Sequence, residues 1–407
     1  MKRSILRLSL FSNVPVAPPD SIMGLSALQK KDPSPLKVNL AIGVYRDGEG
    51  KPFILESVKK AAAVVLRDTQ MDYAPILGLQ SYIDSTQRLC FGPALEAGRP
   101  DALASVQTLS GTGALRLAGD FLHRFSGLKV IHVPSPTYPN HAGIFGQAGI
   151  ALQPYPYYNA TTHKIDVDGM LQYLQGLEKN AVVLLHACAH NPTGCDLTEE
   201  VSKAVVSVCE KKQLVVLVDM AYQGFASGDI DRDALLPRLL AASSVPAFLI
   251  AQSFAKNFGL YGQRTGALHL QCATPKEKEA VLSQLSALIR PSYSNPPIFG
   301  ARVVDTILRD QTLQEEWKKE LKMMSDRLSS IRLTLVKELE ALGCTRDFSH
   351  LAEGIGMMSL SGLSEANVIE LRDKHHIYMT LNGRIAFSGL TSGNVKYVAE
   401  KIHEVCK

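Results

Sequence analysis

The stretch VVLLHACAHNPTGCDLTEEVSKAVVSVCEKKQLVVLV, residues 182–218, has the pattern of a strand, a helix and a second strand. Its two ends, Val182–His186 and Leu214–Val218, are apolar throughout or nearly so, as strands covered on both faces tend to be. Between them, Val201–Lys212 has a helical pattern. Such a unit predicts two parallel strands joined by a helical crossover.

The same alternation extends over residues 100–275. Further strands are expected at Ser105–Leu109, Lys129–Val133, Phe248–Gln252 and Ala267–Leu270, and further helices at Gly113–Phe125 and Asp233–Ala242. This order predicts an α/β fold whose mostly parallel sheet is covered by helices on both faces. Ligands of such folds bind at the carboxyl ends of the strands.

The pattern changes after Ser292. A charge-rich helical stretch is expected from about Ile298 to Leu342, with the only tryptophan, Trp317, inside it. The segment Cys344–Lys407 follows, and we expect it to form most of a smaller α+β domain. The proline-rich Val14–Pro19 predicts an extended arm, because proline disfavours helix there.

A chain of 407 residues is too long for one typical domain and predicts two. We expect a large domain over residues 50–320 and a small domain formed by residues 14–49 and 321–407. Residues 1–13 are expected to be an N-terminal arm or a targeting segment. Lys2, Arg3 and Arg7 precede the first acid, Asp20, which is the charge bias of a mitochondrial targeting segment. A matrix location is therefore expected, with a retained basic arm and a cytoplasmic location as the alternative.

The composition excludes several classes of protein. A net charge of +4 over this length gives no basic stripe, so nucleic acid is not an expected partner. No apolar run reaches the ~18 residues of a membrane-spanning helix. The seven cysteines are scattered and never spaced C-x-x-C, which argues against a disulfide framework or a structural zinc site.

The first polar strand end is QTLSGTGALR, residues 107–116. Backbone N–H groups at the start of a helix, with the hydroxyls of Ser110 and Thr112, suit a phosphate. A tight strand–helix turn without a ligand is the alternative. The glycine spacing differs from G-x-G-x-x-G, and no acid ends the next strand, so a dinucleotide site is disfavoured.

A second strand end carries His186, Cys188 and His190 at alternating positions. Residues two apart on a strand are separated by ~6.5 Å, whereas zinc ligands converge within ~2.0–2.3 Å of one ion. These three side chains cannot ligate one metal together, and no metal site is predicted. The turn that follows would present the amide of Asn191.

Two further strand ends carry a carboxylate and a lysine. Asp219 and Tyr222 follow one apolar strand and would project into the crevice that receives Asn191. A buried carboxylate needs a cationic partner, such as a protonated ring nitrogen.

Lys256 follows another strand between Phe254 and Phe258. Apolar surroundings depress the pKa of a lysine and make its amine nucleophilic. A helix cap and a surface lysine are the ordinary alternatives, but Ser253 and Arg264 flank this lysine with phosphate-binding groups.

Four segments together resemble class I aminotransferases, which depend on pyridoxal 5′-phosphate (PLP), and are most similar to the aspartate aminotransferases. The segments are SFAKNFGLYGQR (253–264), HNPTG (190–194), DMAYQGF (219–225) and GRIAFSGL (383–390). The likeness extends from about Pro18 to the C-terminus, in the same order and spacing. It implies the type I fold of PLP-dependent transferases, in which residues 50–320 would bind the cofactor, and a homodimer with active sites shared across the interface.

The resemblance also implies roles for individual residues. Lys256 would bond to the cofactor and move the proton, and Asp219 would pair with the ring nitrogen, supported by His141. Tyr222 and Asn191 would contact the phenolic oxygen. The phosphate would be held by a set drawn from three segments, with one residue reaching the neighbouring subunit's phosphate: Gly111, Thr112, Ser253 and Arg264, and Tyr73 across the interface. These roles match what a cofactor needs from a protein, namely orientation, phosphate capture and electronic tuning.

Substrate choice would rest on two arginines. Arg384 matches the residue that grips the α-carboxylate in a planar two-point contact, with Gly43 close to the same end of the substrate. Arg290 matches the residue that reaches across the dimer interface to the side-chain carboxylate, and Ser294 and Asn295 lie with it in sequence. An isolated arginine before such a loop is ordinarily a surface residue. Two arginines at opposite ends of one cavity would select aspartate, glutamate and their oxo acids.

One residue departs from the family pattern. Tyr138 stands where aspartate aminotransferases usually place a tryptophan against the cofactor ring. Tyrosine stacks with less area and adds a hydroxyl, so an aromatic or broad-specificity aminotransferase is the alternative. A nicotinamide-dependent dehydrogenase is disfavoured by the glycine spacing. A non-catalytic protein is disfavoured because no cofactor residue is missing.

Overall fold

The computed structural model describes residues 9–407, apart from residues 19, 21, 69–70 and 98. Its centre is a seven-stranded sheet in the order β2-β10-β9-β8-β7-β3-β4. The strands are β2 (Leu103–Leu109), β3 (Val130–Ser135), β4 (Ala151–Pro156), β7 (Val182–His186), β8 (Val215–Met220), β9 (Ala247–Ser253) and β10 (Thr265–Gln271). Only β10 runs antiparallel to its neighbours in this sheet, which confirms the expected mostly parallel arrangement.

All six strands expected from the sequence are present, with small shifts at their ends. The seventh, β4, was not predicted. It lies at the edge of the sheet, most of its residues are exposed or half-buried, and it contains Pro154 and Pro156. Proline is tolerated on an edge strand because the missing N–H has no inner neighbour to bond. The strand therefore lacks the long apolar run that marks the others.

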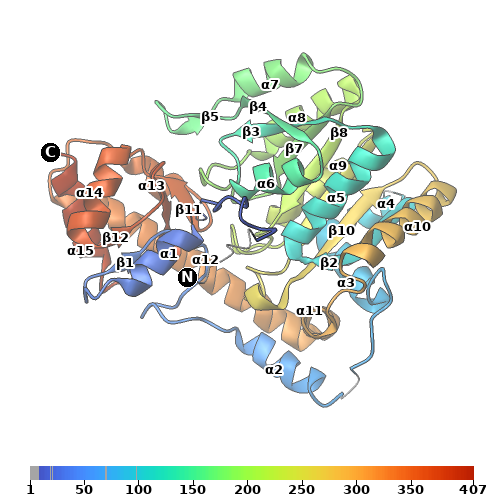
Figure 1. Cartoon of the computed structure of the whole chain (residues 1–407), viewed down its shortest axis with the longest axis horizontal. Coiled ribbons are helices and arrows are strands. Elements are labelled where there is room, and N and C mark those ends of the chain that lie inside the picture. The colour runs from blue at the N-terminus through green and yellow to red at the C-terminus, as the bar shows by residue number, and fades with distance from the viewer. Residues whose placement is uncertain (1–8, 19, 21, 69–70, 98) are drawn as a thin grey trace, which may run out of the picture.

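Helices cover both faces of the sheet (Figure 1). Alternate residues of the central strands enter two separate cores. Val183 and Val216 pack with the cluster that includes α7 (Val167–Gln175), α8 (Glu199–Lys212) and α9 (Leu235–Ala241). Leu184 and Leu217 pack with the cluster that includes α5 (Ser110–Ser126), α6 (Asn140–Gln147) and α10 (Pro275–Ser292). Burial on both faces explains why these strands are apolar throughout.

The expected helices are present with two differences. The stretch expected over Asp233–Ala242 divides into a 3₁₀ turn, η2 (Arg232–Ala234), and α9. The stretch expected from Ile298 to Leu342 divides into α11 (Ile298–Arg309) and α12 (Gln311–Ala341). Asp310 lies between them in an extended conformation, and its side chain accepts the Leu313 N–H at 3.0 Å. An aspartate at this position is a favourable N-cap, so it begins a new helix.

The C-terminal region is built on α12 and two small sheets, as expected for an α+β unit. β11 (Met358–Leu360) pairs with β13 (Arg384–Ala386), and β1 (Val38–Asn39) pairs with β12 (Ile377–Tyr378). The second pair places a segment near the N-terminus beside the C-terminal region (Figure 1). This is the arrangement expected of a small domain made of residues 14–49 and 321–407, although its boundaries stay a prediction.

The remaining elements are short or lie around these layers. They are α1 (Met23–Lys31), α2 (Glu56–Val65), α3 (Gln80–Phe91), α4 (Ala94–Ala97), η1 (Pro100–Ala102), β5 (Tyr158–Asn159), β6 (Lys164–Ile165), η3 (Tyr261–Gln263), α13 (Ser349–Glu353), α14 (Glu365–His375), η4 (Phe387–Gly389) and α15 (Val395–Val405). Residues 14–18 form neither helix nor strand, as expected of an extended arm. The targeting prediction falls mainly on residues 1–8, which lie outside the described residues. Within the described ranges, no helix has both the length and the apolar character needed to cross a bilayer.

Candidate active site

A cavity of about 400 Å³ lies at the carboxyl ends of β7, β8 and β9, beside the N-terminus of α5. Most of the residues predicted from the sequence line it: Gly43, Gly111, Thr112, Tyr138, Asn191, Asp219, Tyr222, Ser253, Lys256, Arg264 and Arg384. Tyr73, Arg290 and Ser294 do not line it, and neither do His141 and Asn295. The structure therefore brings most of the predicted residues together around one cavity at the strand ends.

Asp219 lies near the end of β8, with its carboxylate in the cavity. His141, which is fully buried at the start of α6, lies within hydrogen-bond distance, with 3.2 Å between its Nε2 and Asp219 Oδ2. Thr137 Oγ1 is 2.9 Å from the other ring nitrogen of His141 and fixes the ring between the two partners. Burial works to raise the pKa of Asp219, but His141, His186 and Lys256 outweigh it and hold the pKa below its usual value. The carboxylate is thus ionised at neutral pH.

His186 also lines the cavity beside this pair. Burial lowers its pKa to about 3, so its ring is neutral at physiological pH. Among the described residues, His141, His186 and Asp219 form the one group whose possible metal-ligand atoms all lie within 4.8 Å of one another. Cys188 and His190 do not belong to that group. The expected single extended strand through all three residues is not observed, because β7 ends at His186 and the chain then turns. The ring centroids of His186 and His190 consequently lie only 4.3 Å apart.

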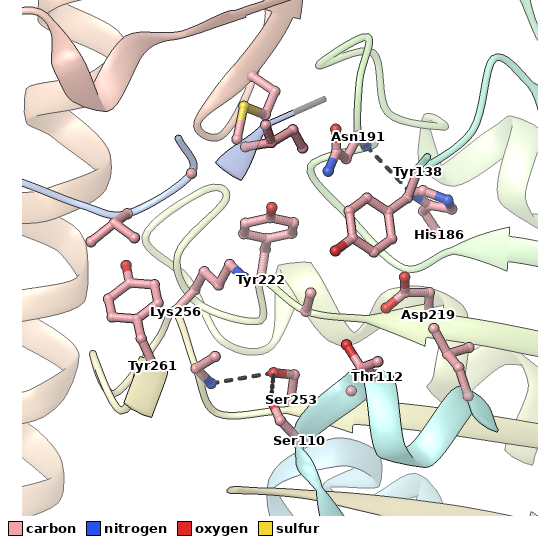
Figure 2. A pocket seen from close by; sticks show the side chains of 18 of the residues that line it. Ser110, Thr112, Tyr138, His186, Asn191, Asp219, Tyr222, Ser253, Lys256 and Tyr261 are labelled. Atoms are coloured by element: carbon pink, nitrogen blue, oxygen red, sulfur yellow. Dashed lines mark hydrogen bonds between the residues drawn. The ribbon is translucent and has the colours of Figure 1, made fainter. Parts of the chain in front are cut away.

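Lys256 lies three residues beyond β9, with Tyr222 and Tyr261 around its side chain (Figure 2). Its Nζ is 5.8 Å from the ring centroid of Tyr222 and 5.7 Å from that of Tyr261. Phe254 and Phe258, which flank it in sequence, are fully buried. Burial lowers the pKa of Lys256 to about 8, although the negative charge of Asp219 works in the opposite direction. The predicted depression of the lysine pKa is confirmed in its direction.

The start of α5 provides backbone donors at another side of the cavity. The first N–H groups of a helix have no intrahelical partner, and no described side chain caps the start of this helix. Ser110 Oγ and Ser253 Oγ are 2.9 Å apart, and Ser253 Oγ also accepts the Ala255 N–H at 3.3 Å. A Cβ at Gly111 would lie 3.1 Å from the Ser253 side chain, so the close approach of β9 to the helix favours glycine. The free N–H groups of α5, the hydroxyls of the two serines and the nearby Arg264 together suit an anion.

Arg384 brings a buried cation to the cavity. It is 2 % exposed, donates from Nη2 to the Ala41 carbonyl at 2.6 Å, and its Nε has no partner among the residues that the structure describes. Within the described part of the chain it forms no ion pair. Asn191 Oδ1 is likewise buried and has no hydrogen-bond partner in the described ranges. Buried polar groups are ordinarily satisfied, so these two side chains are poised for a ligand.

Tyr73, Arg290 and Ser294 lie together outside the cavity. Tyr73 is 90 % exposed, and Arg290, near the end of α10, is also exposed. Arg290 donates to Ser294 Oγ, which donates to Asn295 Oδ1 at 2.7 Å. Asn295 Nδ2 in turn donates to the carbonyl of Ala74 at 2.6 Å, which joins this group to the Tyr73 loop.

Several lining residues were not among the predicted site residues, and they include Ile22, Met23, His186, Tyr261 and Met358. His186 was considered only as a metal ligand, and Tyr261 lies inside a quoted segment without an assigned role. Ile22, Met23 and Met358 carry no local signal of their own. They reach the cavity by the packing of distant segments, and a Cβ at Gly43 would lie only 2.5 Å from Met358 Cε.

Comparison with known proteins places the chain in a family. The model of the family "Aminotransferase class I and II" matches residues 35–402. The mitochondrial aspartate aminotransferase of Dictyostelium discoideum is 44 % identical over 98 % of this chain and 93 % of its own length. A solved mitochondrial aspartate aminotransferase from Trypanosoma brucei is 50 % identical, covers 94 % of this chain and 100 % of its own, and has a TM-score of 0.90.

A third relative is the aromatic-amino-acid aminotransferase of Burkholderia pseudomallei, solved covalently bound to pyridoxal phosphate. It is 41 % identical, covers 98 % of this chain and 100 % of its own, and has a TM-score of 0.92. Family match, sequence identity and fold agree over nearly the whole chain. The chain therefore belongs to the class I and II aminotransferase family.

Proposed function

We propose that this enzyme is an aspartate aminotransferase, which transfers an amino group reversibly between L-aspartate and 2-oxoglutarate to give oxaloacetate and L-glutamate. The observation that carries the proposal is Arg384, a buried guanidinium without an ion-pair partner among the described residues, in the same cavity as Lys256. An arginine in this setting binds a carboxylate in a planar two-point contact. The named aspartate aminotransferases among the relatives support the same substrate class.

Pyridoxal 5′-phosphate fits the residues present. The start of α5, Gly111, Thr112, Ser253 and Arg264 would hold its phosphate, and the ionised Asp219 would pair with its ring nitrogen. Asn191, whose Oδ1 is buried without a partner, and Tyr222 would contact the phenolic oxygen. Tyr138 would lie against the ring. When bound, the cofactor supplies an electron sink for the bond-breaking step at the substrate Cα.

The protein's own groups then have defined tasks. Burial lowers the pKa of Lys256 to about 8, so its amine gains and loses a proton readily near neutral pH and would take the proton from the substrate Cα. His141 keeps Asp219 ionised and oriented through their hydrogen bond. Arg384 and Gly43 would fix the α-carboxylate end of the substrate. Orientation of this kind removes much of the entropic cost of reaction.

We further propose a homodimer in which each subunit completes the site of the other. Tyr73 and the Arg290–Ser294 pair do not line the cavity of their own chain, but they form one connected group at the surface. In a symmetric dimer this group would face the partner's cavity. Tyr73 would then reach the partner's phosphate, and Arg290 with Ser294 would bind the substrate's side-chain carboxylate.

A substrate profile tests the dicarboxylate preference. With 2-oxoglutarate as acceptor, we expect kcat/KM for L-aspartate to exceed that for L-tyrosine by ~100-fold or more, because L-tyrosine has no side-chain carboxylate to pair with the charge of Arg290. The second candidate is an aromatic or broad-specificity aminotransferase, favoured by Tyr138 in the cavity and by the Burkholderia pseudomallei relative. Comparable values for the two amino acids would establish the second candidate instead.

The pKa of Lys256 predicts a pH dependence of cofactor capture by the apoprotein. Only the neutral amine is nucleophilic, so the rate should rise with pH and level off above the lysine pKa of about 8. The negative charge of Asp219 raises that pKa, so Asp219→Asn should move the midpoint to lower pH. Stopped-flow absorbance of the bound cofactor measures both profiles. Asp120→Asn, which removes a carboxylate outside the cavity, should leave the midpoint unchanged; an unmoved midpoint in Asp219→Asn would contradict the coupling.

The location of the enzyme is a separate proposal. Relatives of the chain include mitochondrial and cytoplasmic aspartate aminotransferases. We propose the mitochondrial matrix, supported by the basic, acid-free composition of residues 1–12 and by the two mitochondrial relatives described above. N-terminal sequencing of the natural protein tests this, because an intact N-terminus would favour the cytoplasmic alternative.

A further inference from the structure

The segment Leu40–Tyr45 passes along the cavity, and Ile42, Gly43 and Val44 line it. Its first residues are held by the C-terminal region. Leu40 donates its N–H to the Tyr378 carbonyl at 2.7 Å and accepts the Ala386 N–H at 2.8 Å. The next carbonyl, that of Ala41, accepts the Arg384 guanidinium. Arg384 is therefore hydrogen-bonded directly to this segment.

The other end of the segment is held by Tyr261, which follows Lys256 in the chain. Tyr45 donates its backbone N–H to the hydroxyl of Tyr261 at 2.9 Å. The ring of Tyr261 lies beside Lys256, with its centroid 5.7 Å from Nζ (Figure 2). One side chain thus contacts both the segment that carries Gly43 and the lysine that would carry the cofactor.

We propose that Tyr261 is a positioning residue, whose hydroxyl anchors the segment Leu40–Tyr45 and thereby fixes Arg384 relative to Lys256. The proposal rests on the proposed aminotransferase function. The Ala41 carbonyl of this segment accepts a hydrogen bond from Arg384, and the Tyr45 N–H donates one to Tyr261. Loss of the hydrogen bond at Tyr45 would therefore release one end of the segment that holds the Arg384 guanidinium. Burial raises the pKa of Tyr261 to about 12, so its hydroxyl remains protonated and does not act as a base.

An alternative anchor for Tyr45 is its own ring. Tyr45 is buried, and its ring meets those of Phe53 and Phe225 edge-on, with centroids 5.6 Å and 5.7 Å away. Arg327 also lies over the ring, 5.3 Å from its centroid. These contacts hold the side chain, whereas the hydrogen bond to Tyr261 holds the backbone at the point where it leaves the cavity. The substitution Tyr261→Phe separates the two, because it keeps the aromatic ring beside Lys256 and removes only the hydroxyl.

The test compares the PLP-loaded Tyr261→Phe enzyme with the unsubstituted one. Hydrogen exchange measured by mass spectrometry should be faster in peptides that cover residues 40–46. Binding of succinate, a dicarboxylate that cannot react, should weaken, and KM for aspartate should rise. The dissociation constant of succinate and the KM for aspartate are each expected to rise ~3- to 10-fold, which corresponds to the loss of one hydrogen bond. We expect kcat to change by less than ~3-fold.

Tyr397→Phe is the matched control, because it removes a hydroxyl that donates to the His375 carbonyl at 2.7 Å outside the cavity. It should leave exchange at residues 40–46, succinate affinity and KM unchanged. Unchanged exchange in Tyr261→Phe would overturn the anchor. Faster exchange with unchanged succinate affinity would overturn the link to Arg384. Exchange is measured without turnover, so failure of the unsubstituted enzyme to transaminate would contradict the proposed function and not the anchor.

Discussion

Lys256→Ala is expected to lower kcat for aspartate and 2-oxoglutarate by ~10⁴-fold or more, which is over ~5 kcal/mol of transition-state stabilisation. Among the described residues that line the cavity, Lys256 is the single lysine, so no second amine can take over its covalent and proton-transfer tasks. A coupled assay of oxaloacetate formation measures the loss. Full retention of activity would contradict the proposed role.

The control for this substitution is Lys203→Ala. Lys203 lies on the exposed face of α8, where it pairs with Glu199, and it does not line the cavity. We expect its removal to change kcat by less than ~2-fold and stability by less than ~0.5 kcal/mol, as for an ordinary exposed pair. Thermal unfolding of both variants separates loss of chemistry from loss of fold.

The sheet could be predicted from sequence because its central strands are covered on both faces. Residues such as Leu184 and Leu217 are fully buried, and their neighbours Val183 and Val216 are buried against the opposite layer. This double burial produces an uninterrupted apolar run. The edge strand β4 has one neighbour and exposed prolines, so the same signal is absent. The break between α11 and α12 depends on one capping side chain, Asp310, within an otherwise helical pattern.

The site was predictable where residues follow predicted strands. Asn191 and Lys256 follow the ends of β7 and β9, and Asp219 lies near the end of β8 between them, so the topology brings these positions together. Ile22 and Met358 reach the same cavity from segments more than 300 residues apart in the chain, and only tertiary packing unites them. Arg384 needed the family resemblance, because a lone arginine on a short strand has no local pattern that marks it as a ligand.

Arg290→Asp is expected to reduce kcat/KM for aspartate by ~10³-fold, or ~4 kcal/mol, while activity toward neutral amino acids such as alanine falls far less. The substitution replaces an attractive charge with a repulsive one at the proposed position of the side-chain carboxylate. Arg309→Asp is the matched control: Arg309 is also exposed, lies at the end of α11 and forms a long ion pair with Asp305, at 3.9 Å. An unchanged preference for aspartate over alanine in Arg290→Asp would show that this residue is not the selector.

A hybrid dimer determines which subunit supplies Arg290. Mixing Lys256→Ala and Arg290→Asp chains should produce hybrids in which one site combines an intact Lys256 with the intact Arg290 of the partner chain. If Arg290 acts across the interface, random reassociation restores about a quarter of the unsubstituted activity toward aspartate, because half of the dimers are hybrid and each has one complete site. If Arg290 served the cavity of its own chain, every site would lack one of the two residues. The exposure of Arg290 and its absence from its own cavity lead us to expect recovery. An inactive mixture, despite hybrids detected by native mass spectrometry, would contradict the shared site.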